Sequence, residues 1–357
     1  MSDLDAEWEL FQNQLSNNNQ LKYTDGPIKK DFQEDIPKCS DIYISTQTKI
    51  AYLNQAIDLE PVFWNLPVID YYNPQDGIIK KSMKMNCTTP EKVTELEAKI
   101  KMIPNIEQQI ISQVNNPNAR KIKFKDVRKI DIGLCKKDLI CYRKKKKGAF
   151  YNCFAIILRL LYKNEYKEVH VKIFNTGKLE IPGIQHDELL IITLNKLIGI
   201  LKPLTNDQIN YNKENIQTVL INSNFSCGFF IDRFKLYEIL KQKYSISAGY
   251  DPCSYPGIQC KFYYNRYNEI HEGYKLKGEG EDEKYNTAWQ EISFMIFRTG
   301  SVLIVGNCDS NVLYIIYEFL KKLLIKEYKN IYIKNNTTKK KKSVKKIRKK
   351  TLLFTVK

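Results

Sequence analysis

The chain of 357 residues carries 57 Lys and Arg against 40 Asp and Glu, a formal net charge of +17. With 43% hydrophobic residues it can bury a sizeable core, which excludes a mainly disordered protein and suggests about two folding units. The excess charge is concentrated, since residues 339–350 hold nine basic residues and no acid, and 143–147 hold five more. A near-neutral globular body with two basic runs predicts a polyanionic partner.

The sequence also excludes several classes of protein and site. No stretch reaches the roughly 18 uninterrupted apolar residues of a membrane span, and residues 1–11 lack the basic start and apolar stretch of a signal peptide. Nine scattered cysteines without a CxxC pair, and only three histidines, predict reduced thiols in an intracellular setting and no metal site. No phosphate-binding loop, GxSxG or HExxH occurs, so we predict no catalytic residues, no cofactor and no small-molecule substrate.

The first elements of the chain follow an acidic start. Residues 1–40 are acidic and amphipathic, and a partner-binding helix and an intramolecular mimic of DNA are both open interpretations. Ile44-Ser45-Thr46 precedes a strand, and a helix is expected from Asp58 to Tyr71. An insertion at about 84–140 comes next, and a helix from Pro90 to Ile110 is expected to fill part of it.

A hairpin followed by a helix then occurs twice. Residues 173–201 and 296–324 match at a constant offset of 123 positions, and ten of the 29 positions are identical. In each copy an alternating strand, a Thr-Gly turn and a second strand lead to a helix that Asp187 or Asp309 can cap. Two copies with a long period predict a pseudo-symmetric domain rather than a solenoid, which needs at least three repeats.

The segments before the two hairpins also correspond. Ile216-Gln217-Thr218 is similar to Ile44-Ser45-Thr46, and a helix from Asp232 to Lys243 corresponds to the helix after the first strand. The strands expected immediately before the hairpins are Phe154 to Leu161 and Ile258 to Tyr264. Each repeat therefore predicts strand, helix, strands and helix, an α+β fold with helices on one face of an antiparallel sheet.

The expected organisation has four parts. They are an acidic extension (1–40), a first repeat (41–205, with the insertion at about 84–140), a second repeat (206–335, with a loop insertion at about 266–287) and a Lys-rich tail (336–357). The tail is expected to be disordered, with non-specific DNA affinity, nuclear import and solubility as open roles.

The two hairpins and the entry to the second repeat carry a family resemblance. Phe174-x-Thr-Gly-Lys178, Phe297-x-Thr-Gly and Tyr250-Asp-Pro-Cys-Ser-Tyr255-Pro-Gly257 resemble segments of the TATA-box-binding protein (TBP) family. The insertions and the Lys/Asn/Ile-rich composition look like the TBP-like proteins of large nucleocytoplasmic DNA viruses. The resemblance implies a pseudo-twofold saddle, in which a curved antiparallel sheet carries its helices on the convex face.

The resemblance also implies a function. The expected activity is that of a transcription initiation factor, not an enzyme, which binds AT-rich promoter DNA in the minor groove, bends it with aromatic wedges and recruits a factor resembling transcription factor IIB and an RNA polymerase. It would act in the nucleus or in a viral factory in the host cytoplasm, with packaging in the virion as a further option. The alternative is a protein-interaction module of the same fold, with weak non-specific DNA binding through the basic tail.

The expected wedges are aromatic residues of the strands. Phe174 and Phe297 match the second wedge of each repeat, and Tyr255 matches the first wedge of repeat 2. Three residues stay open for the first wedge of repeat 1: Phe150, Cys153 and Phe154. Core packing is the alternative for the two phenylalanines, although the alternation places both opposite the Val/Ile face that takes the helices.

The remaining expected contacts are polar. Thr46 and Thr218 stand where the family has asparagines that contact bases, and an ordinary strand role is an equal alternative for both. Four basic residues are expected to meet phosphate: Arg159, Lys172, Lys178 and Lys261. Glu180 would face the groove, where a carboxylate repels phosphate unless it is paired. The two threonines in place of asparagines, together with Glu180, predict an altered or relaxed preference for the DNA sequence.

Overall fold

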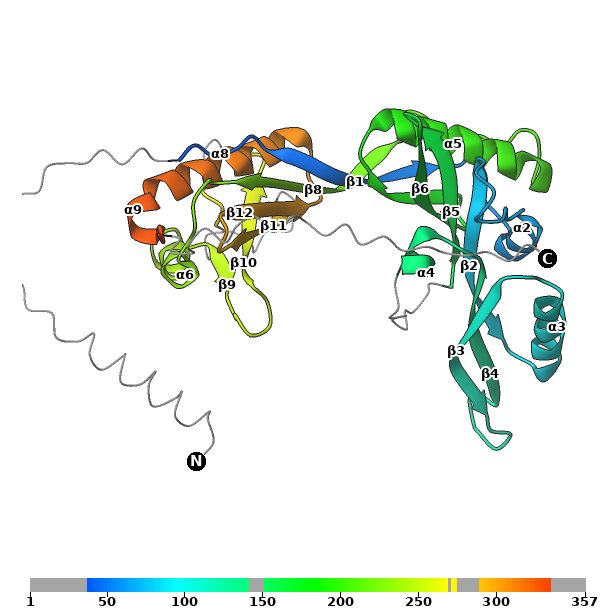
Figure 1. Cartoon of the computed structure of the whole chain (residues 1–357). Helices are drawn as coiled ribbons and strands as arrows, with labels where there is room; N and C mark the ends of the chain where they lie inside the picture. Colours follow the sequence, from blue (N-terminus) through cyan, green and yellow to red (C-terminus); the bar gives the residue numbers. More distant parts are fainter. Residues whose placement is uncertain (1–36, 141–150, 269–270, 275–288, 335–357) are drawn as a thin grey trace, which may run out of the picture. The chain divides into compact units, whose positions relative to one another are not determined.

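The computed structural model describes residues 37–140, 151–268, 271–274 and 289–334 (Figure 1). Phe150, the basic run 143–147, the tail 336–357, most of the acidic extension and most of the loop at 266–287 lie outside these described residues. The expectations for these segments therefore stay predictions.

Within these described residues, twelve strands form one antiparallel sheet in the order β3-β4-β2-β5-β6-β7-β1-β8-β12-β11-β10-β9. The strands are β1 (Tyr43–Tyr52), β2 (Gly77–Cys87), β3 (Ile106–Asn115), β4 (Phe124–Gly133), β5 (Cys153–Tyr162), β6 (Glu165–Phe174), β7 (Lys178–Ile184), β8 (Gln217–Ser226), β9 (Ser247–Gly249), β10 (Gly257–Asn265), β11 (Trp289–Phe297) and β12 (Ser301–Gly306). The helices are α2 (Leu59–Asn65), α3 (Pro90–Lys101), α4 (Lys136–Ile140), α5 (Asp187–Leu201), the short 3₁₀ turn η1 (Lys202–Leu204), α6 (Arg233–Gln242), α8 (Ser310–Lys326) and α9 (Tyr328–Ile331).

The centre of the sheet relates the two repeats. β1 pairs with β8, and Gln47 lies opposite Ile221 near the middle of this pair. Moving outward, β7, β6, β5 and β2 follow on one side, and β12, β11, β10 and β9 follow on the other. The α+β class, the antiparallel sheet and the two internal repeats are thereby confirmed.

Matching hydrogen bonds identify which residues are counterparts. The amide of Leu53 donates to the carbonyl of Gly177, and the amide of Cys227 donates to that of Gly300, both over 2.9 Å. Gly177 and Gly300 have φ of +81° and +79°, and a Cβ on either would lie within 2.3 Å of a backbone oxygen. Both Thr-Gly turns therefore require glycine at this position.

The helices cover one face of the sheet because strand side chains alternate. Val169, Val171 and Ile173 of β6 are buried toward α5, whereas Lys172 and Phe174 face the other way. One hydrophobic core lies between repeat 1 and its helices α2 and α5, and a second lies between repeat 2 and α6 and α8 (Figure 1). The predicted apolar stripe of α8 is buried in the second core.

Each core also receives residues from the start of the other repeat. Ile42 and Ile44, which begin repeat 1, pack against the core of repeat 2. Ile216, at the start of repeat 2, packs against the core of repeat 1. This reciprocal packing follows from the β1–β8 pairing, which carries each first strand past the boundary of its own repeat.

Several expected helix limits are wrong for local reasons. The helix expected to reach Tyr71 ends at Asn65, because Pro67 disfavours helical backbone at the residue before it. The helix expected to reach Ile110 ends at Lys101, and its last residues belong to β3. Asp309 caps α8 as predicted and accepts the amide of Val312 at 2.9 Å.

Asp187 does not cap α5. His186 occupies the N-cap position without a side-chain hydrogen bond, and Asp187 is the first residue of the helix. Its carboxylate instead pairs with the amine of Lys49 at 2.9 Å, which ties the helix start to β1. An acidic residue in the first turn still complements the helix dipole.

The insertion extends the sheet and adds a helix on each side of it. β3 and β4 continue the sheet beyond β2. The buried Arg128 of β4 forms ion pairs with Asp126 of the same strand and with Glu97 of α3, each at 2.7 Å. The pair with Glu97 fixes α3 to the sheet. α4 lies on the opposite side of the sheet from α5 (Figure 1).

Candidate nucleic-acid interface

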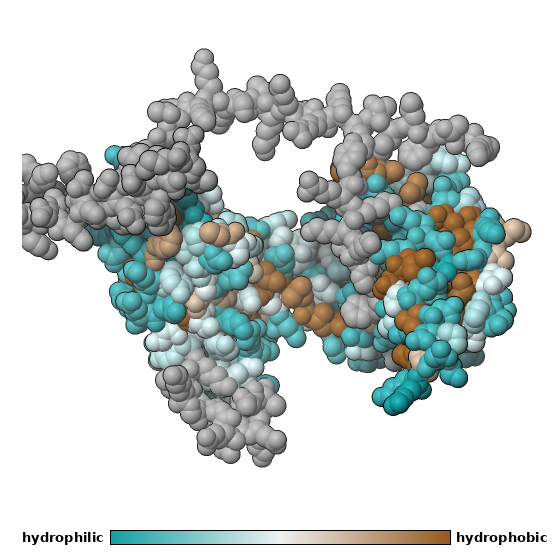
Figure 2. Space-filling view, turned by 90° about the horizontal axis from the view of Figure 1, so that it is seen from below, coloured by the Kyte–Doolittle hydropathy of each residue, from teal (hydrophilic) through white to brown (hydrophobic). Residues whose placement is uncertain are grey.

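The face of the sheet opposite α5 and α8 is called the open face here. At its centre, Thr46 of β1 lies opposite Asn222 of β8, and Thr48 lies opposite Leu220. Leu220 is 40% exposed, which is unusual for a leucine in a central strand. Seen from below, hydrophobic patches lie among hydrophilic residues (Figure 2). This surface is therefore a mixed apolar and polar one.

Repeat 2 holds two aromatic rings together on the open face. The rings of Tyr255 and Phe297 lie 6.0 Å apart, tilted by 59°. Gly257 lies opposite Phe297 in the β10–β11 ladder, and the Tyr255 hydroxyl contacts the sulfur of Met295 at 3.4 Å. Both predicted wedge residues of this repeat are half-buried and lie side by side.

The same register in repeat 1 identifies a residue that the sequence interpretation does not include. Cys153 lies opposite Phe174, as Gly257 lies opposite Phe297, so Cys153 is the counterpart of Gly257. Tyr151 lies two residues before Cys153, just as Tyr255 lies two residues before Gly257. Tyr151 is therefore the counterpart of Tyr255, the first wedge residue of repeat 2. Tyr151 is exposed, and the amine of Lys84 lies 3.5 Å from its ring centroid. Aligning Tyr-Asn-Cys with Tyr-Pro-Gly would have found it.

Two of the three residues left open for this wedge are corrected. Phe154 is completely buried and packs against Phe63 of α2 in the first core, so it cannot contact DNA from the open face. Cys153 does face the open side, but it is only 7% exposed beneath its neighbours. Phe150 lies outside the described residues.

Thr218 is not the counterpart of Thr46. Thr46 precedes Leu53 by seven residues, and Leu220 precedes its counterpart Cys227 by the same number. Irregular pairing between Thr48 and Lys49 places Thr218 opposite Lys49, whose amine reaches Asp187 on the helix side. Leu220 therefore takes the open-face position expected of Thr218, because a bulge turns the strand over.

In this structure, the guanidinium of Arg159 is buried and cannot contact a DNA phosphate. The residue is 6% exposed, and its guanidinium donates to the carbonyls of Tyr71, Asn73 and Gln75. These carbonyls belong to the loop after α2, so the arginine fixes this loop to β5. Its expected phosphate contact is replaced by a structural role.

The three predicted lysines stay on the open face. The amine of Lys172 pairs with Glu180 at 2.7 Å, and that of Lys261 pairs with Glu291 at 2.8 Å. The Glu291 carboxylate raises the pKa of Lys261. Lys178 lies with its amine 5.6 Å from the ring centroid of Phe174. Glu180 is thus paired with Lys172 rather than with its near neighbour Lys178.

Part of the open face in repeat 1 is covered. Cys135, before α4, packs with Ile79 and Ile157 in a small separate cluster, which Tyr71 borders. Lys80 and Asp138 form an ion pair at 2.8 Å above it. The cover formed by the described residues of the insertion lies toward the far end of β5 from Phe174, so it narrows the open face away from this aromatic position.

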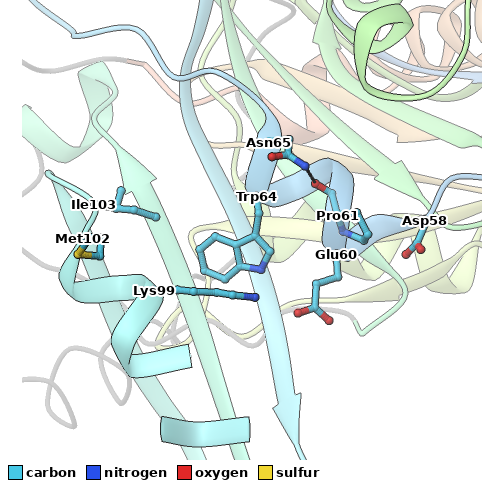
Figure 3. Close-up of a pocket in the computed structure, with 8 residues that line it drawn as sticks. All are labelled: Asp58, Glu60, Pro61, Trp64, Asn65, Lys99, Met102 and Ile103. Carbon is cyan, nitrogen blue, oxygen red and sulfur yellow. Dashed lines mark hydrogen bonds between the residues drawn. The ribbon is translucent and has the colours of Figure 1, made fainter. Parts of the chain in front are cut away.

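A shallow groove of about 790 Å³ lies between α2 and α3, on the helix side. Its lining includes Trp64 and Lys99, and the lysine amine lies 5.7 Å from the tryptophan ring centroid (Figure 3). The indole N–H of Trp64 is buried without a hydrogen-bond partner among the described residues. Its acidic residues, Asp58 and Glu60, lie beside the apolar Trp64 and Met102, so the groove offers a mixed polar and apolar contact surface.

Metal-binding and membrane features were also sought in the described part of the chain. No group of three or more His, Cys, Asp or Glu there could hold a metal ion. No helix within the same residues is long and apolar enough to cross a membrane. Burial raises the pKa of Cys260 to about 12 and that of Cys135 to about 11, which keeps these thiols protonated and unreactive near neutral pH.

The fold and the open face define a two-repeat α+β protein whose open sheet face carries matched aromatic positions and lysines. The chain is 29% identical over 210 residues to a protein named TATA-box-binding protein-like from Acanthamoeba polyphaga mimivirus. The match covers 55% of this chain and 54% of that relative, so the chain spans about half the relative's length. It bears out the predicted resemblance to the TBP-like proteins of large DNA viruses.

Among solved structures, the chain is also similar to Methanococcus jannaschii TBP, with 16% sequence identity and a TM-score of 0.39. That similarity covers 81% of this chain and 99% of the archaeal one. No protein-family model matches the chain.

Proposed function

We propose that this protein is a TBP-like transcription initiation factor that binds duplex DNA through the minor groove on its open face and bends it. The observation that carries the proposal is the matched register of the aromatic positions, Tyr151 with Phe174 and Tyr255 with Phe297. Rings inserted between base steps unstack and kink a duplex, at a cost of a few kcal/mol per step that the additional contact area offsets.

The polar residues of the open face support the same mode of binding. Lys178 and Lys261 offer amines to phosphate, which positions a duplex without reading its sequence. Thr46 can donate its hydroxyl to the adenine N3 or thymine O2 acceptors of the minor groove, and Leu220 supplies an apolar neighbour. A preference for AT-rich promoter DNA follows for the central part of the site.

The proposal extends to the transcription machinery. A duplex bent by this protein would recruit a factor resembling transcription factor IIB and an RNA polymerase, in the nucleus or in a viral factory. The support for this step is the resemblance and the name of the mimivirus relative. Catalysis forms no part of the proposal.

The test is a double variant, Phe174→Ala with Phe297→Ala. Bending of an end-labelled AT-rich duplex, measured by fluorescence transfer, should be lost while the unfolding transition is retained, because both rings are only half-buried. Tyr314→Ala on α8 is the matched control, since this aromatic residue is 53% exposed on a helix. Unchanged bending in the double variant would refute wedge insertion.

Tyr151→Ala tests the wedge that the structure adds. We expect a loss of bending similar to that of Tyr255→Ala, since the two tyrosines occupy equivalent positions. Tyr267→Ala is the control, because this tyrosine is 72% exposed and lies in a loop after β10. If Tyr151→Ala bends DNA like the unaltered protein, repeat 1 has no first wedge at this position.

A protein-interaction module is the second candidate, and the groove beside Trp64 favours it. In that case DNA binding would depend on the basic tail alone. Removing residues 336–357 would then abolish binding and reduce the salt dependence of log K by several units. Under the first proposal the truncated protein still bends DNA.

A further inference from the structure

The two repeats present different chemistry at equivalent positions of the open face. In repeat 2, Met295 of β11 lies opposite Leu303 of β12. In repeat 1, the equivalent positions of β6 and β7 hold Lys172 and Glu180, which also lie opposite each other. An apolar pair in one repeat is thus an ion pair in the other.

The ion pair is well placed to meet a ligand on this face. Lys172 stands two residues before the wedge residue Phe174, on the same side of β6. Its amine lies 2.7 Å from Oε1 of Glu180, and the two side chains remain 33% and 27% exposed. Among the described residues Lys172 is the only hydrogen-bond donor to Glu180, so Oε2 retains its capacity to accept.

The residues opposite the pair in the neighbouring strands are apolar. Ile50 of β1 lies opposite Glu180 and is nearly buried, and Ala155 of β5 lies opposite Lys172. A carboxylate beside a phosphate backbone is unfavourable alone, but the adjacent ammonium makes the pair neutral overall. The pair therefore offers both a donor and an acceptor without adding net charge.

The minor groove distinguishes base pairs by one group. A·T and T·A expose only acceptors there, whereas G·C adds the N2 amino group of guanine, a donor. An apolar surface such as Met295 with Leu303 leaves that amino group unpaired when it is buried, which is unfavourable. A carboxylate accepts from it, and a neighbouring ammonium donates to the flanking acceptors.

We propose that the Lys172–Glu180 pair reads the guanine N2 amino group of a G·C base pair under repeat 1, whereas Met295 and Leu303 restrict the half-site under repeat 2 to A·T. This inference rests on the proposed function, because it requires the open face to meet the minor groove. It makes the preferred site asymmetric and so gives the bound protein one orientation on DNA.

The experiment uses the full chain and base analogues. A duplex selected from a random pool is resynthesised with each guanine replaced by inosine, which keeps the pair with cytosine but lacks the N2 amino group. At one position under repeat 1, we expect binding and bending to weaken roughly tenfold, within the range that a paired base contact contributes. In the converse test, diaminopurine in place of adenine under repeat 2 should weaken binding.

A double variant assigns the effect to the pair. Lys172→Met with Glu180→Leu installs the residues of repeat 2 and leaves no unpaired charge, so binding should no longer distinguish guanine from inosine. Lys167→Met with Glu165→Leu is the matched control, since this exposed ion pair lies on the same strand, away from the open face. The control should keep the roughly tenfold preference.

The outcomes separate the two proposals. If the unaltered protein bends DNA but binds guanine and inosine duplexes equally, the reading of guanine is wrong and the proposed function stands. The reading of guanine is also wrong if the Lys172→Met, Glu180→Leu protein keeps the preference. If no duplex is bent by the unaltered protein, both proposals fail.

Discussion

Gly257 shows how closely the aromatic pair of repeat 2 is packed. A Cβ at this position would lie 3.0 Å from Cε1 of Phe297 and 3.2 Å from Cε1 of Tyr255. These contacts are tighter than ordinary van der Waals distances, so a side chain at this position would require the two rings to move by a few tenths of an ångström.

Gly257→Ala should therefore displace the rings without unfolding the sheet. We expect the free energy of unfolding to fall by about 1 kcal/mol, which is typical of mild overpacking. We also expect most of the DNA bending to be lost. Gly249→Ala is the control, because a Cβ there would meet its nearest neighbour only at 4.0 Å. Chemical unfolding and fluorescence transfer measure the two effects, and equal bending by both variants would contradict the prediction.

Individual contact residues are harder to predict than their general location. Alternation and the Thr-Gly turns predict the side of the sheet for Phe174 and Phe297, and the resemblance of residues 250–257 predicts the position of Tyr255. All three lie on the open face. The signal for Tyr151 is only the short match of Tyr-Asn-Cys to Tyr-Pro-Gly, and Thr218 lies two residues from the true counterpart of Thr46. A bulge or a different strand start moves the assignment of residues to the two faces of the sheet by one or two positions. Local patterns such as alternation and turns in a single sequence do not indicate these shifts.

A buried group of charged residues helps to attach α3 of the insertion to the sheet. Asp126 is fully buried, and its two carboxylate oxygens accept from Nε and one terminal nitrogen of Arg128 at 2.7 and 2.9 Å. Arg128 also donates to Glu97 of α3. Removing one partner of such a pair leaves a buried charge without compensation.

Asp126→Ala should destabilise the protein by about 3 kcal/mol, because the buried Arg128 then keeps only the partly exposed Glu97 as a carboxylate partner. Glu165→Ala, which breaks the exposed pair with Lys167, should destabilise the protein far less, because solvent screens an exposed ion pair. Urea unfolding of both variants measures the difference. Similar losses in the two variants would mean that Asp126 does not anchor α3.

The elements themselves follow the sequence patterns where packing agrees with them. The hairpin of repeat 2, its Thr-Gly turn and the apolar stripe of α8 are all predictable from periodicity. The insertion is not, because α3 and β3 share a run of mixed residues whose pattern predicts one helix. β3 is a strand because it pairs with β4, a tertiary contact that outweighs local propensity.

Buried thiols give the whole molecule a pH dependence. Burial raises the pKa of Cys135, Cys227 and Cys308 to about 11 and that of Cys260 to about 12, from an ordinary value of 9.0. Because the folded state holds these protons more tightly, the stability they contribute is complete below pH 9 and is lost as the pH rises toward 11 to 12.

We therefore expect the free energy of unfolding to fall above pH 9, by up to about 1.4 kcal/mol per pH unit for each thiol. Lys81 opposes this trend, since burial lowers its pKa to about 8, but one amine is outweighed by four thiols. Denaturant unfolding between pH 8 and 10.5, with a reductant, measures the effect. Cys260→Ala should flatten the decline and the exposed Cys253→Ala should not, whereas stability that rises with pH would contradict the assignment.

The reciprocal packing of Ile44 and Ile216 determines the order in which the molecule can be completed. A ribosome synthesises repeat 1 before β8 exists, so β1 emerges with one edge unpaired and with isoleucines whose core has not yet been made. Either half expressed alone would expose that edge and aggregate. The pairing of β1 with β8 joins segments that are far apart in the sequence, and such long-range contacts form slowly during folding.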